Sequence, residues 1–218
     1  MIPTPDYGKL HDSVYEPAED SFILLDALEQ DLERIRSSEP TICLEIGSGS
    51  GIASAFLANA VGPSTALFLS TDINPNACSA TQNTSHLNKV NINPVRASLV
   101  DPLLARIRAV RGVDVLLFNP PYVPTEELEL LQTQQGADIG ATWAGGLDGM
   151  KVTDIILDLL PELLQPRGVF YLVAVSENNP QQICQTMKGR GFEAEVALKR
   201  RAGRELLHVL KIVKPAGE

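Results

Sequence analysis

A short polar turn, Asn119-Pro120-Pro121-Tyr122, follows the apolar run Val115–Phe118 and is the segment best suited to chemistry. Proline has a fixed φ angle and no N–H, so this turn is rigid and offers carbonyl oxygens without competing donors. An oxygen of Asn119 and the carbonyl of Pro120 can each accept one N–H of a planar NH2 group, while Tyr122 packs against its face. The turn therefore indicates a site for an amide or amino nitrogen, the alternative being a turn that only ends a strand.

Three alternate glycines, Gly47, Gly49 and Gly51, connect a buried strand to a helix. Glycine permits a tight turn and lets a ligand lie on the backbone at a helix N-terminus. The G-x-G-x-G spacing differs from the G-x-G-x-x-G of dinucleotide-binding folds. Glu45, at the end of the strand, would repel a pyrophosphate but would accept hydrogen bonds or attract a cation. These features favour a cofactor loop over a purely structural turn.

A second carboxylate, Asp72, ends the next strand about 20 residues further on, where a carboxylate binds the two hydroxyls of a ribose. The alternative role of Asp72 is to cap the following helix. In an α/β sheet of this kind the first and fourth strands are neighbours, and ligands bind at the switch point between them. The glycine loop and the Asn119 turn are therefore expected to face one crevice.

The elements that position these residues form a mostly parallel sheet. Apolar runs of strand length alternate with helical patterns over the 218 residues, which is typical of a single α/β domain, here 1–218, with helices on both faces of the sheet. The predicted strands are Thr41–Ile46, Ala66–Asp72, Val95–Leu99, Val113–Phe118, Val169–Val175, Glu193–Leu198 and Glu205–Val213; the predicted helices are Glu19–Ile35, Gly51–Ala60, Pro75–Asn88, Pro102–Arg108, Lys151–Leu164 and Pro180–Lys188. Too little chain separates the last two strands for a helical crossover, so they should form an antiparallel hairpin at a sheet edge.

Composition narrows the classes of partner. The chain has 27 acidic against 18 basic residues, a net charge of -9, whereas proteins that hold nucleic acid by its phosphates are usually basic. Its three cysteines have neither a disulfide nor a metal-binding spacing, and they are expected in the core. No secretory signal or membrane-spanning run is visible, so we expect a cytoplasmic or nuclear location.

The motifs together resemble a known family. The glycine loop, Asp72 and the Asn119 turn look like a class I S-adenosylmethionine-dependent methyltransferase that acts on amide or exocyclic amino nitrogens. Val14–Phe22 and Trp143–Gly146 are closer still to the eukaryotic and archaeal branch of the HemK-type release factor glutamine methyltransferases. The resemblance covers nearly the whole chain. It implies a Rossmann-like seven-stranded sheet, methylation of the glutamine in the Gly-Gly-Gln motif of the translation termination factor, and a small zinc-binding partner subunit.

The resemblance also implies roles for individual residues. Glu45 and Gly47 would contact the methionine part of the cofactor, Asp72 the ribose, and Ser21 would reach the cofactor from an N-terminal covering segment, 1–38. Gly49 and Asn119 would line the same cofactor crevice. Near the adenine the family usually has Asp-Leu, whereas this chain has Ser98 and Leu99 followed by Val100 and Asp101. Either Ser98 or Asp101 would bind the adenine, beside Leu99.

On the substrate side, Asn119, Pro121 and Tyr122 would bind the target amide, and Asn119 with Pro120 and Tyr122 would make up the catalytic turn. The irregular stretch 123–148 is interpreted as a substrate-side loop, in which Trp143 either lines the substrate groove or is a buried anchor of the loop. No catalytic base or metal is expected, and His11, His86 and His208 are interpreted as structural.

Other functions remain open at this stage. The same turn would bind the amino group of adenine in DNA or RNA, but no added recognition domain is visible, and Lys199–Arg201 with Arg204 is more simply a solvated hairpin. Methylation of a protein lysine, as in a histone, is a further alternative. A catalytically inactive scaffold is disfavoured by the intact Glu45, Asp72 and Asn119.

The third strand, predicted at Val95–Leu99 after Val90–Pro94, would lie at the open edge of the sheet. An unpaired edge invites another strand, so the small partner subunit is expected to extend the sheet there as a heterodimer. Without it the chain should be poorly soluble or weakly active. Charged substitutions at Val95 or Ile92 are expected to weaken the complex.

Overall fold

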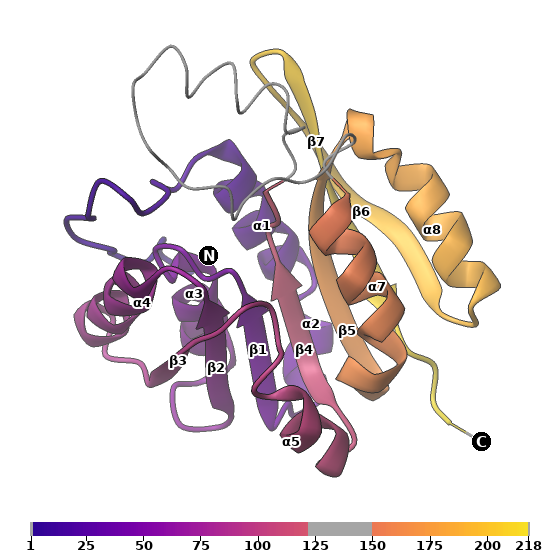
Figure 1. The fold of residues 1–218 in the computed structure, drawn as a ribbon, viewed down its shortest axis with the longest axis horizontal. Coiled ribbons are helices and arrows are strands. Elements are labelled where there is room, and N and C mark those ends of the chain that lie inside the picture. Colours follow the sequence, from indigo (N-terminus) through magenta and orange to yellow (C-terminus); the bar gives the residue numbers. More distant parts are fainter. Residues whose placement is uncertain (1, 122–149, 218) are drawn as a thin grey trace.

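The computed structural model describes residues 2–121 and 150–217, which contain one seven-stranded sheet with the strand order β3-β2-β1-β4-β5-β7-β6 (Figure 1). The strands are β1 (Ile42–Ile46), β2 (Leu67–Asp72), β3 (Ile92–Arg96), β4 (Val113–Phe118), β5 (Leu164–Val175), β6 (Glu193–Ala202) and β7 (Glu205–Val213). β1 to β5 are parallel, and β7 is antiparallel to both β5 and β6. The predicted mostly parallel sheet and its antiparallel hairpin are confirmed.

Helices cover both faces of the sheet (Figure 1). They are α1 (Glu19–Gln30), α2 (Leu32–Ser37), α3 (Ile52–Val61), α4 (Pro75–Leu87), α5 (Leu104–Ala109), α7 (Lys151–Leu163) and α8 (Pro180–Gly189), with a short 3-10 turn, η1 (Ser176–Asn178). Apolar side chains of α1, α2 and α3 share one core with Cys43 and Val115, while those of α5, α7 and α8 share the other with Leu44 and Leu116. Neighbouring residues of a strand point to opposite faces of the sheet. Because a core covers each face, β4 is buried along its whole length.

Two element boundaries differ from the sequence prediction near the edges of the sheet. β3 was predicted at 95–99 but spans Ile92–Arg96, and it stops before a turn in which Leu99 has a left-handed φ of 48°. Pro94 lies within β3, which is tolerated because an edge strand has a free side where the missing N–H is not needed. β6 continues to Ala202, so Arg200 and Arg201 lie in a strand rather than in the hairpin turn.

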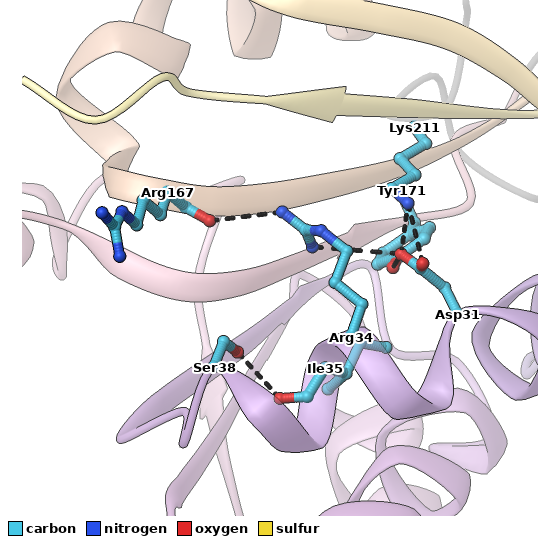
Figure 2. A network of polar contacts seen from close by, with 7 residues as sticks. All are labelled: Asp31, Arg34, Ile35, Ser38, Arg167, Tyr171 and Lys211. Atoms are coloured by element: carbon cyan, nitrogen blue, oxygen red, sulfur yellow. Dashed lines mark hydrogen bonds and ion pairs between the residues drawn. The ribbon is translucent and has the colours of Figure 1, made fainter.

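The predicted helix Glu19–Ile35 is divided at Asp31, and a polar network fixes the division (Figure 2). The carboxylate of Asp31 accepts hydrogen bonds from the Tyr171 hydroxyl on β5 and from Lys211 Nζ on β7, the latter at 2.7 Å. Arg34 approaches the same carboxylate at 3.9 Å, and its guanidinium donates to the Arg167 carbonyl at 3.4 Å. The junction of α1 and α2 is thereby fastened to β5 and β7.

Among the described residues, no helix combines the length and apolar character needed to cross a bilayer. The three cysteines are free thiols; Cys43 and Cys184 are buried as predicted, whereas Cys78 is only half-buried, so its predicted core position was wrong.

Candidate active site

The glycine loop between β1 and α3 is held rigidly at the carboxyl end of the sheet. Gly47 N and Ser48 N both donate to the Thr71 carbonyl on β2, at 2.8 and 3.1 Å. Gly49 has a φ of 51° and faces open space, since a Cβ built there would meet nothing within 4 Å. At Gly51 a Cβ would come within 2.8 Å of the Thr81 Cα on α4, so only glycine permits this packing. The loop therefore presents bare backbone to a ligand at Gly49.

Glu45 is a buried carboxylate at the end of β1, directed at the first turn of α3. Its Oε2 accepts hydrogen bonds from the backbone N–H of Ser54, at 3.0 Å, and from the Ser54 hydroxyl. Burial, with a smaller contribution from the nearby charge of Asp72, raises the pKa of Glu45 to about 8 against the opposing effect of the two Ser54 bonds. A cation at this position would stabilise the ionised form.

Asp72 lies beside the loop at the end of β2, with only 5% of its surface exposed. Its Oδ2 accepts from Gly49 N and its Oδ1 from Asn74 N, each at 2.9 Å. Each oxygen retains acceptor capacity for a ligand hydroxyl. Burial raises the pKa of Asp72, and the backbone hydrogen bonds oppose that shift. The cap of α4 is Asn74, whose side chain accepts from Asn76 N, so the alternative role of Asp72 as helix cap is excluded.

The N-terminal segment reaches the same edge of the sheet. Asn74 Nδ2 donates to the Ser13 carbonyl at 2.7 Å, whereas Asp6 exchanges hydrogen bonds with Asn88 at the other end of α4, toward the start of β3. Ser21 is buried in the first turn of α1, where its N–H donates to Asp20 at 2.7 Å. Contact of Ser21 with a cofactor stays a prediction.

Asn119 follows β4, which pairs with β1, so its side chain lies near the end of the strand that carries Glu45. Asn119 Nδ2 donates to Asp20 Oδ2 at 3.0 Å. Asn119 Oδ1 is buried and accepts no hydrogen bond from the residues that the structure describes. A buried amide oxygen without a donor is uncommon, because its desolvation costs about 1–3 kcal/mol. This oxygen is therefore a ready acceptor for a substrate N–H.

The remaining predicted residues divide into two groups. Pro120 is buried and Pro121 half-buried directly after Asn119, whereas Tyr122, Trp143 and the stretch 123–148 lie outside the described residues. Ser98 and Leu99 follow β3 directly after Ala97. Because Ala97 N donates to the Asp72 carbonyl at 2.9 Å, Ser98 and Leu99 come next in the chain after a residue bonded to Asp72, the proposed ribose carboxylate. Ser98 and Asp101 are exposed, and the choice between them for adenine stays open.

None of the histidines forms a hydrogen bond with Glu45 or Asn119 in the described part of the chain. His11 and His86 bond to neighbouring side chains on the surface, and His208 is buried in β7, where burial lowers its pKa. Within the described part of the chain, no three acidic, histidine or cysteine side chains gather as a metal site.

The donor set fits S-adenosylmethionine, which carries a positive sulfonium, an ammonium group and a ribose. Two buried carboxylates, Glu45 and Asp72, suit the positive charge and the hydroxyls, and the open backbone at Gly49 leaves room for the cofactor to approach. Asn119 Oδ1 offers an acceptor on the neighbouring strand.

Comparison with known proteins places this geometry in a family. The chain is 49% identical over 217 residues to the mouse protein named methyltransferase HEMK2, covering 98% of this chain and 97% of the relative. The chain belongs to the HemK-type release factor glutamine methyltransferase family. It is also 41% identical to the Schizosaccharomyces pombe eRF1 methyltransferase catalytic subunit mtq2, with 98% and 96% of the two chains covered. A Moorella thermoacetica release factor glutamine methyltransferase is 27% identical over 90% of this chain and 67% of its own length.

A solved structure of the family has the same architecture. The chain superposes with a TM-score of 0.65 and 26% identity on a protein in the structure of the E. cuniculi Mtq2–Trm112 complex, described as methylating the termination factor eRF1; the match covers 93% of this chain and 99% of the other. The fold is that of class I Rossmann-like methyltransferases. No family model matches the sequence.

The structure also shows a residue that sequence reasoning did not assign, Asp20. Val14–Phe22 entered the sequence prediction only through the family resemblance, and Ser21 was the residue of this segment expected to contact the cofactor. The acidic residue in that segment was visible in the sequence. Its hydrogen-bond partner, Asn119, lies 99 positions away, so the sequence pattern did not connect the two residues.

Proposed function

We propose that this protein transfers the methyl group of S-adenosylmethionine to the side-chain nitrogen of a glutamine, in the Gly-Gly-Gln motif of the translation termination factor. The observation that carries the proposal is the buried, unpartnered Oδ1 of Asn119 at the end of β4, beside the loop and carboxylates that fit the cofactor. Family membership supports the same reaction, since relatives are named eRF1 and release factor glutamine methyltransferases.

The residues of the chain act by orientation. An amide nitrogen is a poor nucleophile because its lone pair is delocalised into the carbonyl. Asn119 Oδ1 and the Pro120 carbonyl accept one N–H each, which turns the lone pair toward the methyl group and favours a pyramidal nitrogen. When bound, the cofactor supplies an electrophilic methyl group on a positively charged sulfur. As the N–C bond forms and the S–C bond breaks, the nitrogen becomes positive and then loses a proton to solvent.

The cofactor would be held by the residues at the carboxyl ends of β1, β2 and β3. Glu45, Gly47 and Gly49 bind the methionine part, Asp72 binds the ribose hydroxyls, and Ser98 or Asp101 with Leu99 meets the adenine. Asp72 is suited to the ribose because both oxygens are already fixed by Gly49 N and Asn74 N.

Binding of nucleic acid is disfavoured by the surface charges. Within the basic cluster, Arg200 forms ion pairs with Asp26 and Glu19 of α1, so it contributes less to a patch for phosphates. The net charge of -9 acts in the same direction.

We further propose a small zinc-binding subunit as partner at β3, the free edge next to β2. The related structure is a complex of Mtq2 with Trm112. Two exposed leucines, Leu67 at the start of β2 and Leu87 at the end of α4, lie toward the start of β3 and add apolar surface. Ile92 was also predicted to contact the subunit. Its side chain is only 1% exposed and packs in the core with residues of α3, so this prediction was wrong.

The test uses the chain co-expressed with the small subunit and a cofactor bearing a CD3 group. The termination factor, a DNA oligomer and a histone-tail peptide are incubated in parallel and analysed by mass spectrometry. We expect label on the Gly-Gly-Gln glutamine alone and a loss of at least about 100-fold with Asn119→Ala, at unchanged cofactor affinity. Label on adenine or lysine, or substantial turnover by the variant, would overturn the proposal.

A further inference from the structure

The catalytic amide of Asn119 is held by a residue of the N-terminal helix. Asp20, in the first turn of α1, is 5% exposed, and its Oδ2 accepts from Asn119 Nδ2 at 3.0 Å. Its Oδ1 accepts from Ser21 N at 2.7 Å and from the Tyr15 hydroxyl at 3.1 Å. Both oxygens of Asp20 are thus fixed by donors, one of which is the Asn119 side chain.

This arrangement determines which end of the amide faces the substrate. A carboxylate only accepts hydrogen bonds, so the NH2 end of Asn119 must point at Asp20. The oxygen then lies on the other branch of the amide, where it is buried and accepts no bond from the described residues. If the amide turned by 180°, two acceptor oxygens would face each other at about the same 3.0 Å, which is repulsive.

We propose that Asp20 is a positioning residue that selects the Asn119 orientation with Oδ1 toward the target nitrogen. This inference rests on the proposed function, because it assigns Oδ1 the task of accepting the N–H of the target. Tyr15 and Ser21 hold Asp20 in turn, so the segment that leads into α1 orients the catalytic turn across the sheet.

A purely structural role for Asp20 is the main rival. An acidic side chain in the first turn stabilises a helix through its dipole, and Glu19 occupies the same turn. A structural residue affects the folded fraction, whereas a positioning residue affects turnover of the folded enzyme. The two roles are therefore separated by kcat at saturating substrates.

The first experiment measures methylation of the termination factor by Asp20→Ala, with the chain co-expressed with its proposed subunit. We expect kcat to fall at least about 10-fold, with cofactor affinity and substrate KM within about threefold of wild type. The matched control is Asp26→Asn, which removes an acidic partner of Arg200 from the same helix and should leave kcat unchanged. A kcat within twofold of wild type for Asp20→Ala overturns the inference.

The second experiment exchanges the two side chains. Asn119→Asp alone places two carboxylates together and should lose at least about 100-fold in kcat. Adding Asp20→Asn restores one donor facing one carboxylate, with an acceptor oxygen again directed at the substrate. We expect the double variant to be at least about 10-fold faster than Asn119→Asp. No recovery in a folded double variant would contradict the positioning role.

A readout without turnover keeps this inference separate from the proposed function. In 15N-asparagine-labelled protein, the Asn119 side-chain NH2 protons should be shielded from exchange in the wild type and lose that protection in Asp20→Ala. Unchanged protection overturns the inference even if the wild type methylates glutamine. Lost protection supports it even if the wild type labels a different acceptor.

Discussion

Replacing Asp72 by asparagine tests the cofactor site most directly. Asp72 accepts one backbone N–H at each oxygen, from Gly49 and from Asn74, each at 2.9 Å. Asparagine has a single acceptor oxygen, so whichever way its amide turns, one of these N–H groups faces an NH2 donor. The same change removes the negative charge that would accept the ribose hydroxyls.

The size of the effect follows from these contacts. A hydrogen bond to a charged group contributes about 1.5–3 kcal/mol, and about 1.4 kcal/mol corresponds to a tenfold change in Kd. Asp72→Asn should therefore weaken S-adenosylmethionine binding by about 10- to 150-fold. Part of the cost also falls on folding, because one buried N–H loses its partner.

Asp114→Asn is the matched control. Asp114, near the start of β4, accepts from Thr41 N at 2.8 Å and from Ile42 N at 2.9 Å, both at Oδ2, so it also fixes backbone, through one oxygen and at the opposite end of the sheet. It should lower stability without changing cofactor affinity. Calorimetric titration with S-adenosylmethionine and urea denaturation measure the two effects separately. A Kd within twofold of wild type for Asp72→Asn, or equal weakening by Asp114→Asn, would refute the ribose assignment.

Three further outcomes are expected. Because the pKa of Glu45 is raised to about 8, its carboxyl stays protonated in the folded state at pH values where the unfolded chain, with a pKa near 4.5, has released the proton. The free energy of unfolding should therefore fall as the pH rises from about 5 to about 8. Urea titrations of Glu45→Gln should lack this part of the pH dependence. Val95→Asp, at the half-buried edge of β3, should reduce co-purification of the small subunit while cofactor affinity stays unchanged, and intact complex would count against the edge. Asp31→Asn should lower the free energy of unfolding by about 2–4 kcal/mol, because it leaves the buried Tyr171 hydroxyl and Lys211 without their anion. Tyr171→Phe should cost only about 1 kcal/mol. Equal losses for the two variants would contradict this account.

Much of the fold could be predicted because strands buried on both faces are apolar along their whole length. β4 was predicted at its observed limits, and the glycine loop and Asn119 fall at adjacent strand ends as the switch-point rule requires. β3 was misplaced because an edge strand has one free side and accepts proline, so Asn93 and Pro94 appeared to be turn residues. The division of α1 and α2 was missed because a tertiary anion site, not a helix breaker, stops the helix at Asp31.

The candidate site was predictable only where its residues lie close to strand ends in sequence. Glu45, Asp72 and Asn119 each follow or end an apolar run, so their positions are readable from the pattern. The partner of Asn119 is not, because Asp20 belongs to a helix whose packing places it over β4. Sequence patterns identify which residues lie at the carboxyl ends of the strands, whereas the contacts between these residues decide which atom of each faces a ligand.

The two buried carboxylates at this edge of the sheet suggest why the product would be released after transfer. Glu45 and Asp72 are buried and their pKa values are raised by that burial, so their ionised forms gain most from a nearby cation. S-adenosylmethionine brings a positive sulfur, which methyl transfer makes neutral in S-adenosylhomocysteine. The carboxylates therefore lose part of their attraction for the cofactor in the step that completes the reaction. The same acidic environment would thus bind the reactant more tightly than the product, without any movement of the sheet.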